Sequence, residues 1–300
     1  MKIYLIGHFG QLGSVLGQKL TSQYEVIGTH RMIVGDSIPN VDLIINASAY
    51  THVDRAEVER GSCHAVNVEL PKYLAQKARE MDIPLIHFCT NYVFDGNRHG
   101  CPYVETDRCL PLSHYGKTKL EGTLVVGNEH SKYLVFRLSG IYGGVRSFVK
   151  TMTDAYHKRA EVIVVNDQAI TPNDVSPVSE VVVNIIHQMT LPGFNKWGTY
   201  HLSGEGETSW HDFACSVYEK LNMMNKTQVP APKPISSEDY SRRYNGTIAA
   251  RPRYAVLDSS KLARTFGLTL GSWEEQFEEF WENEYRPSKN NPSSMDTINH

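Results

Sequence analysis

The sequence predicts an α/β fold, in which a doubly wound parallel sheet is followed by a smaller C-terminal α/β lobe. Strand-like apolar runs alternate with helical patterns through the first half of the 300 residues, and the runs are continuously apolar, as in strands buried on both faces. The alternation loosens after about residue 150. We expect a first unit at residues 1–160 and a second at 161–285 that returns some chain to the first. The polar, proline-interrupted residues 286–300 predict a disordered tail.

The elements follow from the same patterns, taken in chain order. Strands of the sheet are expected at residues 2–7, 24–29, 41–48, 84–90 and 132–139, with helices at 11–20, 71–80 and around Tyr115. In the second unit, residues 162–167 and 198–203 resemble short strands, and residues 176–189 and 209–221 resemble helices. A parallel sheet needs such helical crossovers.

Composition excludes several classes of protein. The formal net charge is −3 with scattered Lys and Arg, so we expect neither nucleic acid nor a membrane surface as partner. No apolar run approaches the roughly 18 residues of a membrane helix, and the N-terminus is too short for a signal peptide. Five cysteines without a C-x-x-C pair indicate reduced thiols and a cytoplasmic protein rather than a zinc site.

A glycine-rich turn follows the first strand. Gly7, Gly10 and Gly13 stand in GHFGQLG, directly before a helical pattern. Glycines let the backbone approach a pyrophosphate, and the helix N-terminus offers free N–H groups to it. The turn therefore predicts a Rossmann-like dinucleotide site, although close packing alone could also explain the glycines.

The end of the second strand bears on the choice of dinucleotide. An acidic residue there would bind the ribose 2′-hydroxyl of NADH, but this chain has His30 followed by Arg31. Arg31 could pair with a 2′-phosphate, which favours NADPH and leaves NADH as the alternative. A solvated surface charge would also explain Arg31.

The spacing Tyr-x-x-x-Lys occurs three times, and on a helix it places both side chains on one face. Tyr73 and Lys77 lie in the predicted helix at 71–80, where a structural role is expected. The copy at 285–289 contains Pro287, which prevents a regular helical pairing. Tyr115 and Lys119 follow a strand that ends at Thr90, and ligands of doubly wound sheets lie beyond such strand ends. Tyr115 and Lys119 are therefore the pair that we expect to take part in chemistry.

These motifs carry a family resemblance. Together with the glycine turn, the segments NASAYTHVDRAE, CTNYVFDG and PLSHYGKTKLEG are similar to the extended short-chain dehydrogenase/reductase superfamily, and within it to the dTDP-4-dehydrorhamnose reductase family. The likeness continues through VNDQAITP, GTYHLSGEGETSWHDFA and RPRYAVLDSSKL, so it covers nearly the whole chain.

The resemblance implies three sets of site residues. The catalytic set is Thr90, Tyr115 and Lys119. The set that contacts the cofactor is Gly7, Gly10, Gln11, Leu12, Gly13, His30, Arg31, Asp36, Ser37, Ala47, Ser48, Ala49, Tyr115 and Lys119. The set that contacts substrate is Thr90, Asn91, Tyr92 and Arg251, and the second unit, residues 161–285, is expected to be mainly the substrate-binding lobe. For Arg251 and Arg253 a guanidinium fork would suit a diphosphate, but a surface ion pair is equally consistent with the sequence.

The reduction of a ketone, which the resemblance implies, needs an acid and hydrogen-bond donors beside the carbonyl oxygen. A hydride that reaches a ketone carbon leaves an alkoxide, and a positioned acid must supply a proton. Tyr115 is expected to donate it, and Thr90 to hydrogen-bond the carbonyl oxygen. Lys119 and the oxidised nicotinamide are expected to lower the tyrosine pKa from about 10 by roughly 2–3 pH units.

The chain departs from the family pattern at several places. Asn91 stands where an Asp is usual, and Gly140 where a Trp is usual, so the pocket for the sugar should lack a wide apolar platform. Residues 30–40 are too short for the extra strand and helix expected there. Val15 replaces the acidic residue through which some relatives bind magnesium at a dimer interface, so no metal site is expected, while a homodimer stays open.

The resulting hypothesis is an NADPH-dependent reductase of the 4-keto group of a nucleotide-activated 4-keto-6-deoxy sugar, in deoxysugar biosynthesis. Two alternatives stay open on the sequence. One is an NADP-binding regulatory subunit that resembles the methionine adenosyltransferase β subunit, and the other is a sugar-nucleotide epimerase. The sequence names neither the sugar nor the nucleotide base.

Overall fold

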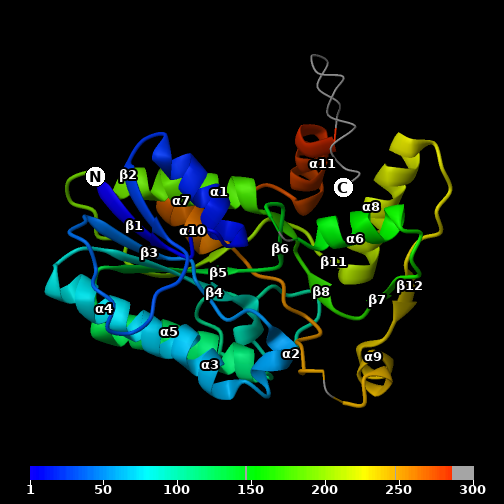
Figure 1. The fold of residues 1–300 in the computed structure, drawn as a ribbon, viewed down its shortest axis with the longest axis horizontal. Helices are drawn as coiled ribbons and strands as arrows, with labels where there is room; N and C mark the ends of the chain where they lie inside the picture. Colours follow the sequence, from blue (N-terminus) through cyan, green and yellow to red (C-terminus); the bar gives the residue numbers. More distant parts are fainter. Residues whose placement is uncertain (146, 247, 286–300) are drawn as a thin grey trace.

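A six-stranded parallel sheet forms the centre of the larger unit (Figure 1). The computed structural model describes residues 1–145, 147–246 and 248–285, so the predicted tail and Lys289 lie outside the described residues. The strand order is β10-β5-β4-β3-β1-β2. The strands are β1 (Lys2–Ile6), β2 (Glu25–Thr29), β3 (Leu43–Asn46), β4 (Leu85–Thr90), β5 (Tyr133–Leu138) and β10 (Gly198–Leu202). The predicted α/β fold with a parallel sheet is confirmed.

The register brings the carboxyl ends of the strands to one edge. Ile6 pairs with Asn46, Asn46 pairs with His87, and Thr90 pairs with Leu138. All four residues of β3 are buried, and so are the first five of β4, because helices cover both faces of the sheet. The chain that leaves each strand therefore emerges at a common edge, where ligands of such sheets bind.

Two helical layers cover the sheet (Figure 1). On one face lie α1 (Gln11–Thr21), α7 (Val175–Met189) and α10 (Ser260–Phe266), which share an apolar core with the sheet. On the other face lie α4 (Leu70–Glu80) and α5 (His114–Glu129), with a second core. Leu16 and Leu74 are wholly buried, one in each core.

A third core belongs to the second lobe. It joins α6 (Phe148–His157), α8 (Trp210–Asn225) and α11 (Trp273–Tyr285) around buried aromatic residues such as Phe213. Although α6 precedes residue 160, it packs here, whereas α7 and β10 follow residue 160 and belong to the sheet unit. The exact boundary between the two units stays a prediction.

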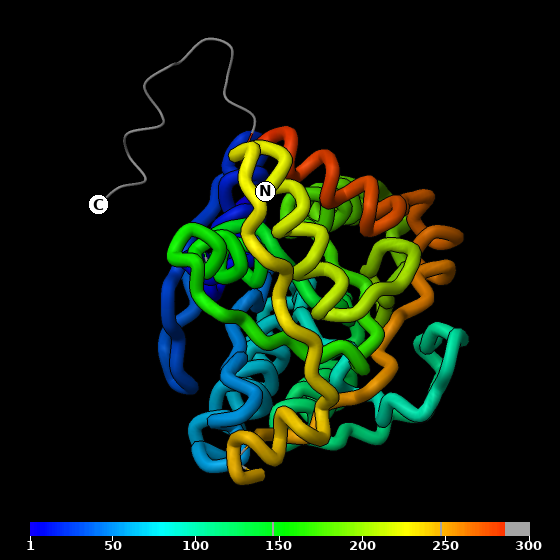
Figure 2. Tube along the Cα trace, turned by 90° about the vertical axis from the view of Figure 1, so that its right-hand side faces the viewer, coloured from blue at the N-terminus to red at the C-terminus, as the bar shows by residue number. Residues whose placement is uncertain are grey.

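The remaining elements connect these layers. They are α2 (Val53–Ala56), α3 (Arg60–His64), a π-helical turn η1 (Ala65–Glu69), a 3₁₀ turn η2 (Asn91–Val93), β6 (Ile141–Tyr142), β7 (Ile163–Val165), β8 (Ala169–Ile170), β9 (Asn173–Asp174), β11 (Thr208–Ser209), β12 (Lys233–Ile235) and α9 (Ser237–Arg243). Figures 1 and 2 show the chain around α9 lying near α2 of the other unit. The connection from β2 to β3 carries no helix or strand at residues 30–42, as its length predicted.

Candidate functional site

The start of α5 is fixed by three local interactions. Ser113 caps the helix by accepting a hydrogen bond from the Gly116 N–H at 3.1 Å, and Glu57 accepts one from the His114 N–H at 2.7 Å. A Cβ atom on Gly116 would lie 2.4 Å from the Tyr92 carbonyl oxygen, so only glycine lets α5 approach η2 this closely. Glu57, which precedes α3 in the chain, thus caps the N-terminus of α5.

Tyr115 lies at the carboxyl edge of β4 with two neighbours. The ring of Tyr92 meets it edge to face, with centroids 6.1 Å apart. Thr90, the last residue of β4, is its second neighbour. Burial raises the pKa of the Tyr115 hydroxyl well above 10, and the Thr90 side chain offsets only part of that rise. The group is therefore a protonated donor at neutral pH, and the expected lowering of its pKa does not occur in the protein alone.

Lys119 lies one turn further along α5 and is 3% exposed. Its Nζ donates a hydrogen bond to the Phe88 carbonyl oxygen at 2.7 Å, and burial lowers the pKa of the ammonium group. An ammonium group has three donors, so two are still free to meet a ribose hydroxyl or a phenolate. The structure thus brings Thr90, Tyr115 and Lys119 together at one strand end.

The competing Tyr-x-x-x-Lys copy in α4 has structural contacts. The Tyr73 hydroxyl donates a hydrogen bond to the Asp36 carbonyl oxygen at 2.8 Å, and Lys77 forms an ion pair with Glu80 at 2.6 Å. Tyr73 also packs against the core beneath α4. Its place on the flank of the sheet agrees with the structural role expected for it.

The glycine turn has the geometry of a phosphate cradle. Gly7 has φ +83°, and a Cβ atom there would lie 2.7 Å from the Ser48 backbone nitrogen. A Cβ atom on Gly13 would lie 2.0 Å from the Gly7 carbonyl oxygen. Gly10 is the N-cap residue of α1 and provides no side-chain cap, and the first turn of the helix carries no acidic residue. The open helix N-terminus fits the diphosphate of a dinucleotide.

Two other residues of the turn have contacts within the protein. The Gln11 side chain donates hydrogen bonds to the carbonyl oxygens of Ile141 and Gly143, at 3.2 and 3.0 Å, and so joins α1 to the chain after β5. Leu12 is buried in the core between α1 and the sheet. Their contacts with a cofactor stay predictions.

The loop expected to contact the adenosine end is open to solvent. His30, Arg31, Asp36 and Ser37 are all exposed, and the exposed ring of Phe9 meets His30 edge to face. The Asp36 carboxylate accepts a hydrogen bond from the Ile33 N–H at 2.9 Å and so closes a turn of this loop. The role of these four residues in binding the cofactor stays a prediction.

Sequence reasoning missed Asn46, which holds the predicted Ala47, Ser48 and Ala49 segment in place. Its buried side chain accepts hydrogen bonds from the Ser48 N–H at 3.1 Å and the Ser48 hydroxyl at 2.6 Å. A polar residue that ends a continuously apolar strand was the available signal.

Asn91 and Arg251, both predicted to contact substrate, have protein partners. The Asn91 side chain is 2% exposed, and its Nδ2 donates to the Ala255 carbonyl at 2.7 Å and to Ser139 at 3.2 Å. Arg251 pairs with Asp54 of α2 through two contacts of 2.9 Å. Burial would raise the pKa of Asp54, but Arg251 outweighs it and holds that pKa below 3.8. The ion pair that the sequence allowed is therefore present, and binding of substrate by both residues stays a prediction.

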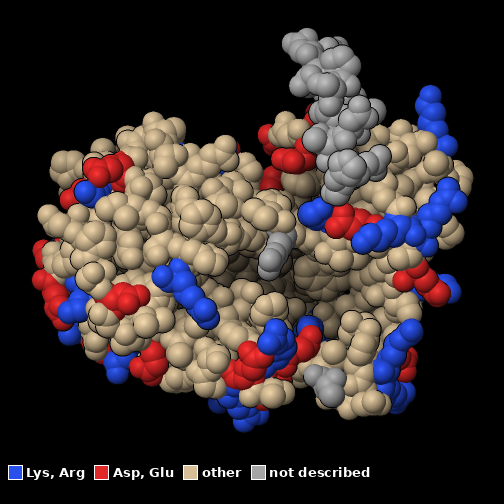
Figure 3. Space-filling model, viewed as in Figure 1, with Lys and Arg blue, Asp and Glu red and all other residues tan. Residues whose placement is uncertain are grey.

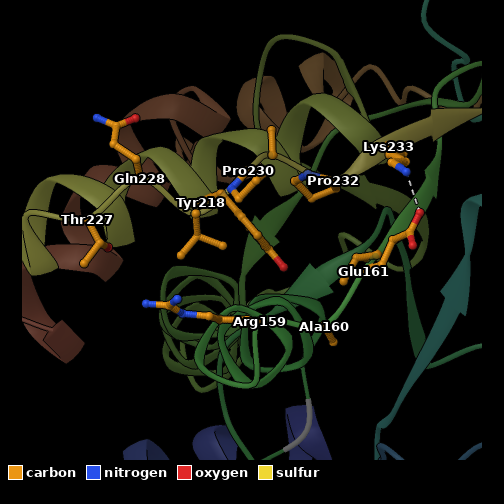
Figure 4. Close-up of a pocket in the computed structure, with 12 residues that line it drawn as sticks. Arg159, Ala160, Glu161, Tyr218, Thr227, Gln228, Pro230, Pro232 and Lys233 are labelled. Carbon is orange, nitrogen blue, oxygen red and sulfur yellow. Dashed lines mark hydrogen bonds and ion pairs between the residues drawn. The ribbon is translucent and has the colours of Figure 1, made fainter.

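Two cavities lie elsewhere in the described part of the chain, and neither is lined by Thr90, Tyr115 or Lys119. A cavity of about 320 Å³ lies in the second lobe, with Tyr218 pointing between Arg159 and Ala160 and the Lys233–Glu161 ion pair beside it (Figure 4). Another of about 370 Å³ lies beyond β10. Among the described residues, no group of three His, Cys, Asp or Glu side chains is placed to hold a metal ion, and no helix there is long and apolar enough to cross a membrane.

Comparison with known proteins decides the family. The family described as "RmlD substrate binding domain" matches residues 1–286. The chain is 34% identical to a dTDP-4-dehydrorhamnose reductase from Aggregatibacter actinomycetemcomitans, over 91% of this chain and 96% of that protein. The chain belongs to the dTDP-4-dehydrorhamnose reductase family. A reductase of this name from Escherichia coli K12 is 31% identical, again over 91% of this chain and 95% of the relative.

Solved structures of the dTDP-4-dehydrorhamnose reductase family share the fold. One from Clostridium acetobutylicum superposes with a TM-score of 0.83 at 31% identity, over 94% of this chain and 99% of that one. Another, from Bacillus anthracis, was determined in complex with NADP and gives a TM-score of 0.81 at 29% identity, over 94% and 98% of the chains. The family resemblance found in the motifs is thus confirmed.

Proposed function

We propose that this protein is an NADPH-dependent reductase of the 4-keto group of a nucleotide-linked 4-keto-6-deoxy sugar, of the dTDP-4-dehydrorhamnose reductase type. One observation carries the proposal: Tyr115 of α5 lies beside Thr90, and Lys119 of the same helix binds the Phe88 carbonyl oxygen, at the carboxyl end of β4 in a sheet whose first turn forms a phosphate cradle. The family membership supports the same reaction and the same class of substrate. NADPH is the proposed cofactor, as in the family structure determined with NADP.

The side chains divide the chemistry among them. The Tyr115 hydroxyl, protonated at neutral pH, donates a proton to the ketone oxygen as negative charge develops there. Thr90 lies beside it and donates a second hydrogen bond to that oxygen. Lys119 stabilises the phenolate that remains, because its ammonium group is buried close to the reacting end of α5. NADPH, when bound, supplies the hydride.

The same residues hold and orient the cofactor. In this proposal Gly7, Gly10 and Gly13 with the N-terminus of α1 receive the pyrophosphate, and the spare donors of Lys119 receive the nicotinamide ribose. The exposed guanidinium of Arg31 pairs with the 2′-phosphate. Ser48, oriented by Asn46, lies against the turn and closes the cradle.

We further propose that the reaction takes place in the cytoplasm. The five cysteines are all free in the structure, which agrees with a reducing compartment. A homodimer stays a prediction that analytical ultracentrifugation tests.

The test is a turnover assay with the purified protein. NADPH, and separately NADH, is incubated with a panel of dTDP- and UDP-linked 4-keto-6-deoxy sugars, while absorbance follows the cofactor and NMR identifies products. We expect NADPH to be consumed with a dTDP-linked sugar. Binding of NADPH with formation of a sugar isomer, and without net oxidation, would replace the proposal by an epimerase. Binding without any change in sugar would leave a regulatory subunit.

A further inference from the structure

Gly140 of the larger unit and the Trp210 ring of the second lobe meet near the edge of the sheet that carries Thr90. Gly140 lies two residues beyond Leu138, the end of β5, and Leu138 pairs with Thr90 in the sheet. The intervening Ser139 accepts a hydrogen bond from Asn91, the residue after Thr90, at 3.2 Å. Gly140 therefore emerges at the same edge as the Thr90 and Tyr115 hydroxyls.

The space above Gly140 is filled from the second lobe. A Cβ atom on Gly140 would lie 2.8 Å from Cη2 and 3.2 Å from Cζ2 of Trp210, the far edge of the indole ring. Real Cβ atoms do not approach other atoms this closely, so any side chain at 140 would displace the ring. The wide apolar group whose loss was expected from Gly140 is thus replaced by Trp210, 70 positions further along the chain.

Trp210 is held so that part of its ring stays accessible. It begins α8 directly after Ser209, whose hydroxyl caps the helix by accepting from the Asp212 N–H at 3.0 Å. The ring of Phe148, the first residue of α6, lies 4.8 Å away at 50°. Phe148 in turn stacks on the buried Phe213 at 5.7 Å. Trp210 and Phe148 are both half-buried, unlike Phe213.

Gly140 follows a strand of the sheet and Trp210 packs on the core of the second lobe, so their contact joins the two units. The surface is hollowed there in Figure 3, between the unit with the sheet and the lobe with α6 and α8. Phe148 and Trp210 are the first residues of α6 and α8. Few charged side chains appear on the walls of this hollow in the same view.

We propose that Trp210, supported by Phe148, forms the apolar wall of the sugar site and selects the deoxygenated carbon 6 of the substrate. This inference rests on the proposed function. The C–H face of a hexose and a methyl group at carbon 6 both match an indole surface, whereas a hydroxyl at carbon 6 would lose its hydrogen bonds to water against that surface. A single such group typically changes selectivity by roughly 10- to 200-fold.

Variants on both sides of the contact test the proposal. Trp210→Ala removes the wall, Trp210→Phe shortens it, and Gly140→Ala displaces it from the other unit. Trp197→Phe is the matched control, because Trp197 is also half-buried but packs on the core between the sheet and α7. Folding is checked by thermal unfolding, so the milder Trp210→Phe and Gly140→Ala proteins keep the test valid if Trp210→Ala does not fold.

The measurements are KM and kcat for the 4-keto sugar that serves as substrate, and Kd for NADPH. The third measurement is the ratio of the dissociation constants of dTDP-glucose and dTDP-6-deoxyglucose. We expect Trp210→Ala to raise KM about tenfold or more and to reduce that ratio by a similar factor. Gly140→Ala should change both in the same direction by less, and Kd for NADPH should stay within twofold in every variant.

The outcomes separate this inference from the function on which it rests. If the wild-type protein reduces the sugar and Trp210→Ala leaves both KM and the ratio unchanged, the wall is assigned wrongly while the reductase stands. An equal loss of NADPH binding would show that Trp210 supports the whole fold instead. If the wild-type protein neither reduces nor binds a dTDP-linked sugar, the proposed function fails first.

Discussion

Replacing Asp54 by Asn should weaken both the fold and the position of Arg251. The two side chains make contacts of 2.9 Å and are 39% and 21% exposed. Removing one partner costs about 3–5 kcal/mol for a buried pair and about 0–1 kcal/mol for an exposed one. For this intermediate exposure, after discounting for solvent screening, we expect the free energy of unfolding to fall by about 1–2 kcal/mol at pH 7. Asn still offers an oxygen to the Ala249 N–H, which now donates to Asp54 at 2.9 Å.

The sign of the pH dependence follows from the lowered pKa of Asp54. Because the folded pKa lies below the ordinary 3.8, the stabilisation is present above that value and is lost as the pH falls through the folded pKa. Urea unfolding of the wild-type protein and Asp54→Asn should therefore differ at pH 7 and converge at strongly acidic pH. A constant difference at both pH values would contradict the ion-pair explanation.

A double-mutant cycle with Arg251→Gln isolates the pair. We expect a coupling energy of about 1–2 kcal/mol between the two positions, and a KM for the sugar nucleotide that rises roughly 10- to 100-fold in Arg251→Gln if this residue also binds the diphosphate. Glu80→Gln is the control, because it breaks the more exposed pair with Lys77 and should change stability by less than about 0.5 kcal/mol. Additive effects of Asp54→Asn and Arg251→Gln would show that the two side chains do not stabilise each other.

Three further predictions concern single positions. Tyr115→Phe should lower kcat by roughly 10²- to 10⁴-fold while Kd for NADPH changes less than twofold, and Tyr73→Phe should leave kcat unchanged; equal losses in steady-state assays would be inconsistent with the assignment. Arg31→Ala should weaken NADPH about 10- to 100-fold in fluorescence titrations and leave NADH unaffected, whereas equal weakening of both would exclude a 2′-phosphate contact. Burial raises the pKa of Asp174 to about 6, so its ionisation destabilises the fold as the pH rises from 4 to 6. Asp174→Asn should gain about 3 kcal/mol relative to wild type over that range, and a difference that does not change with pH would contradict this.

Local patterns were sufficient for much of the fold. The alternation of apolar runs and helices predicted the parallel sheet, and the length of residues 30–40 predicted a connection without a helix. Thr90, Tyr115 and Lys119 could be brought together from the sequence because a strand end and a helical i, i+4 spacing constrain them.

Contacts between distant segments could not be predicted in the same way. Nothing near Arg251 in the sequence indicates Asp54, which lies 197 positions earlier and binds it across the two units. The Trp210 ring over Gly140 likewise depends on how the second lobe docks. The raised pKa of Tyr115 reflects burial, which a spacing of residues does not reveal.

The most direct test of the proposed hydride transfer follows an isotope from the cofactor to the sugar. NADPH carrying deuterium at the reactive carbon 4 of the nicotinamide is incubated with the purified protein and a dTDP-linked 4-keto-6-deoxy sugar, and the product is analysed by NMR and mass spectrometry. We expect one deuterium at carbon 4 of the sugar for each NADPH oxidised, and a rate of transfer roughly 10²- to 10⁴-fold lower in Tyr115→Phe. A product without deuterium at that carbon, or transfer at the wild-type rate in Tyr115→Phe, would contradict the proposed reaction.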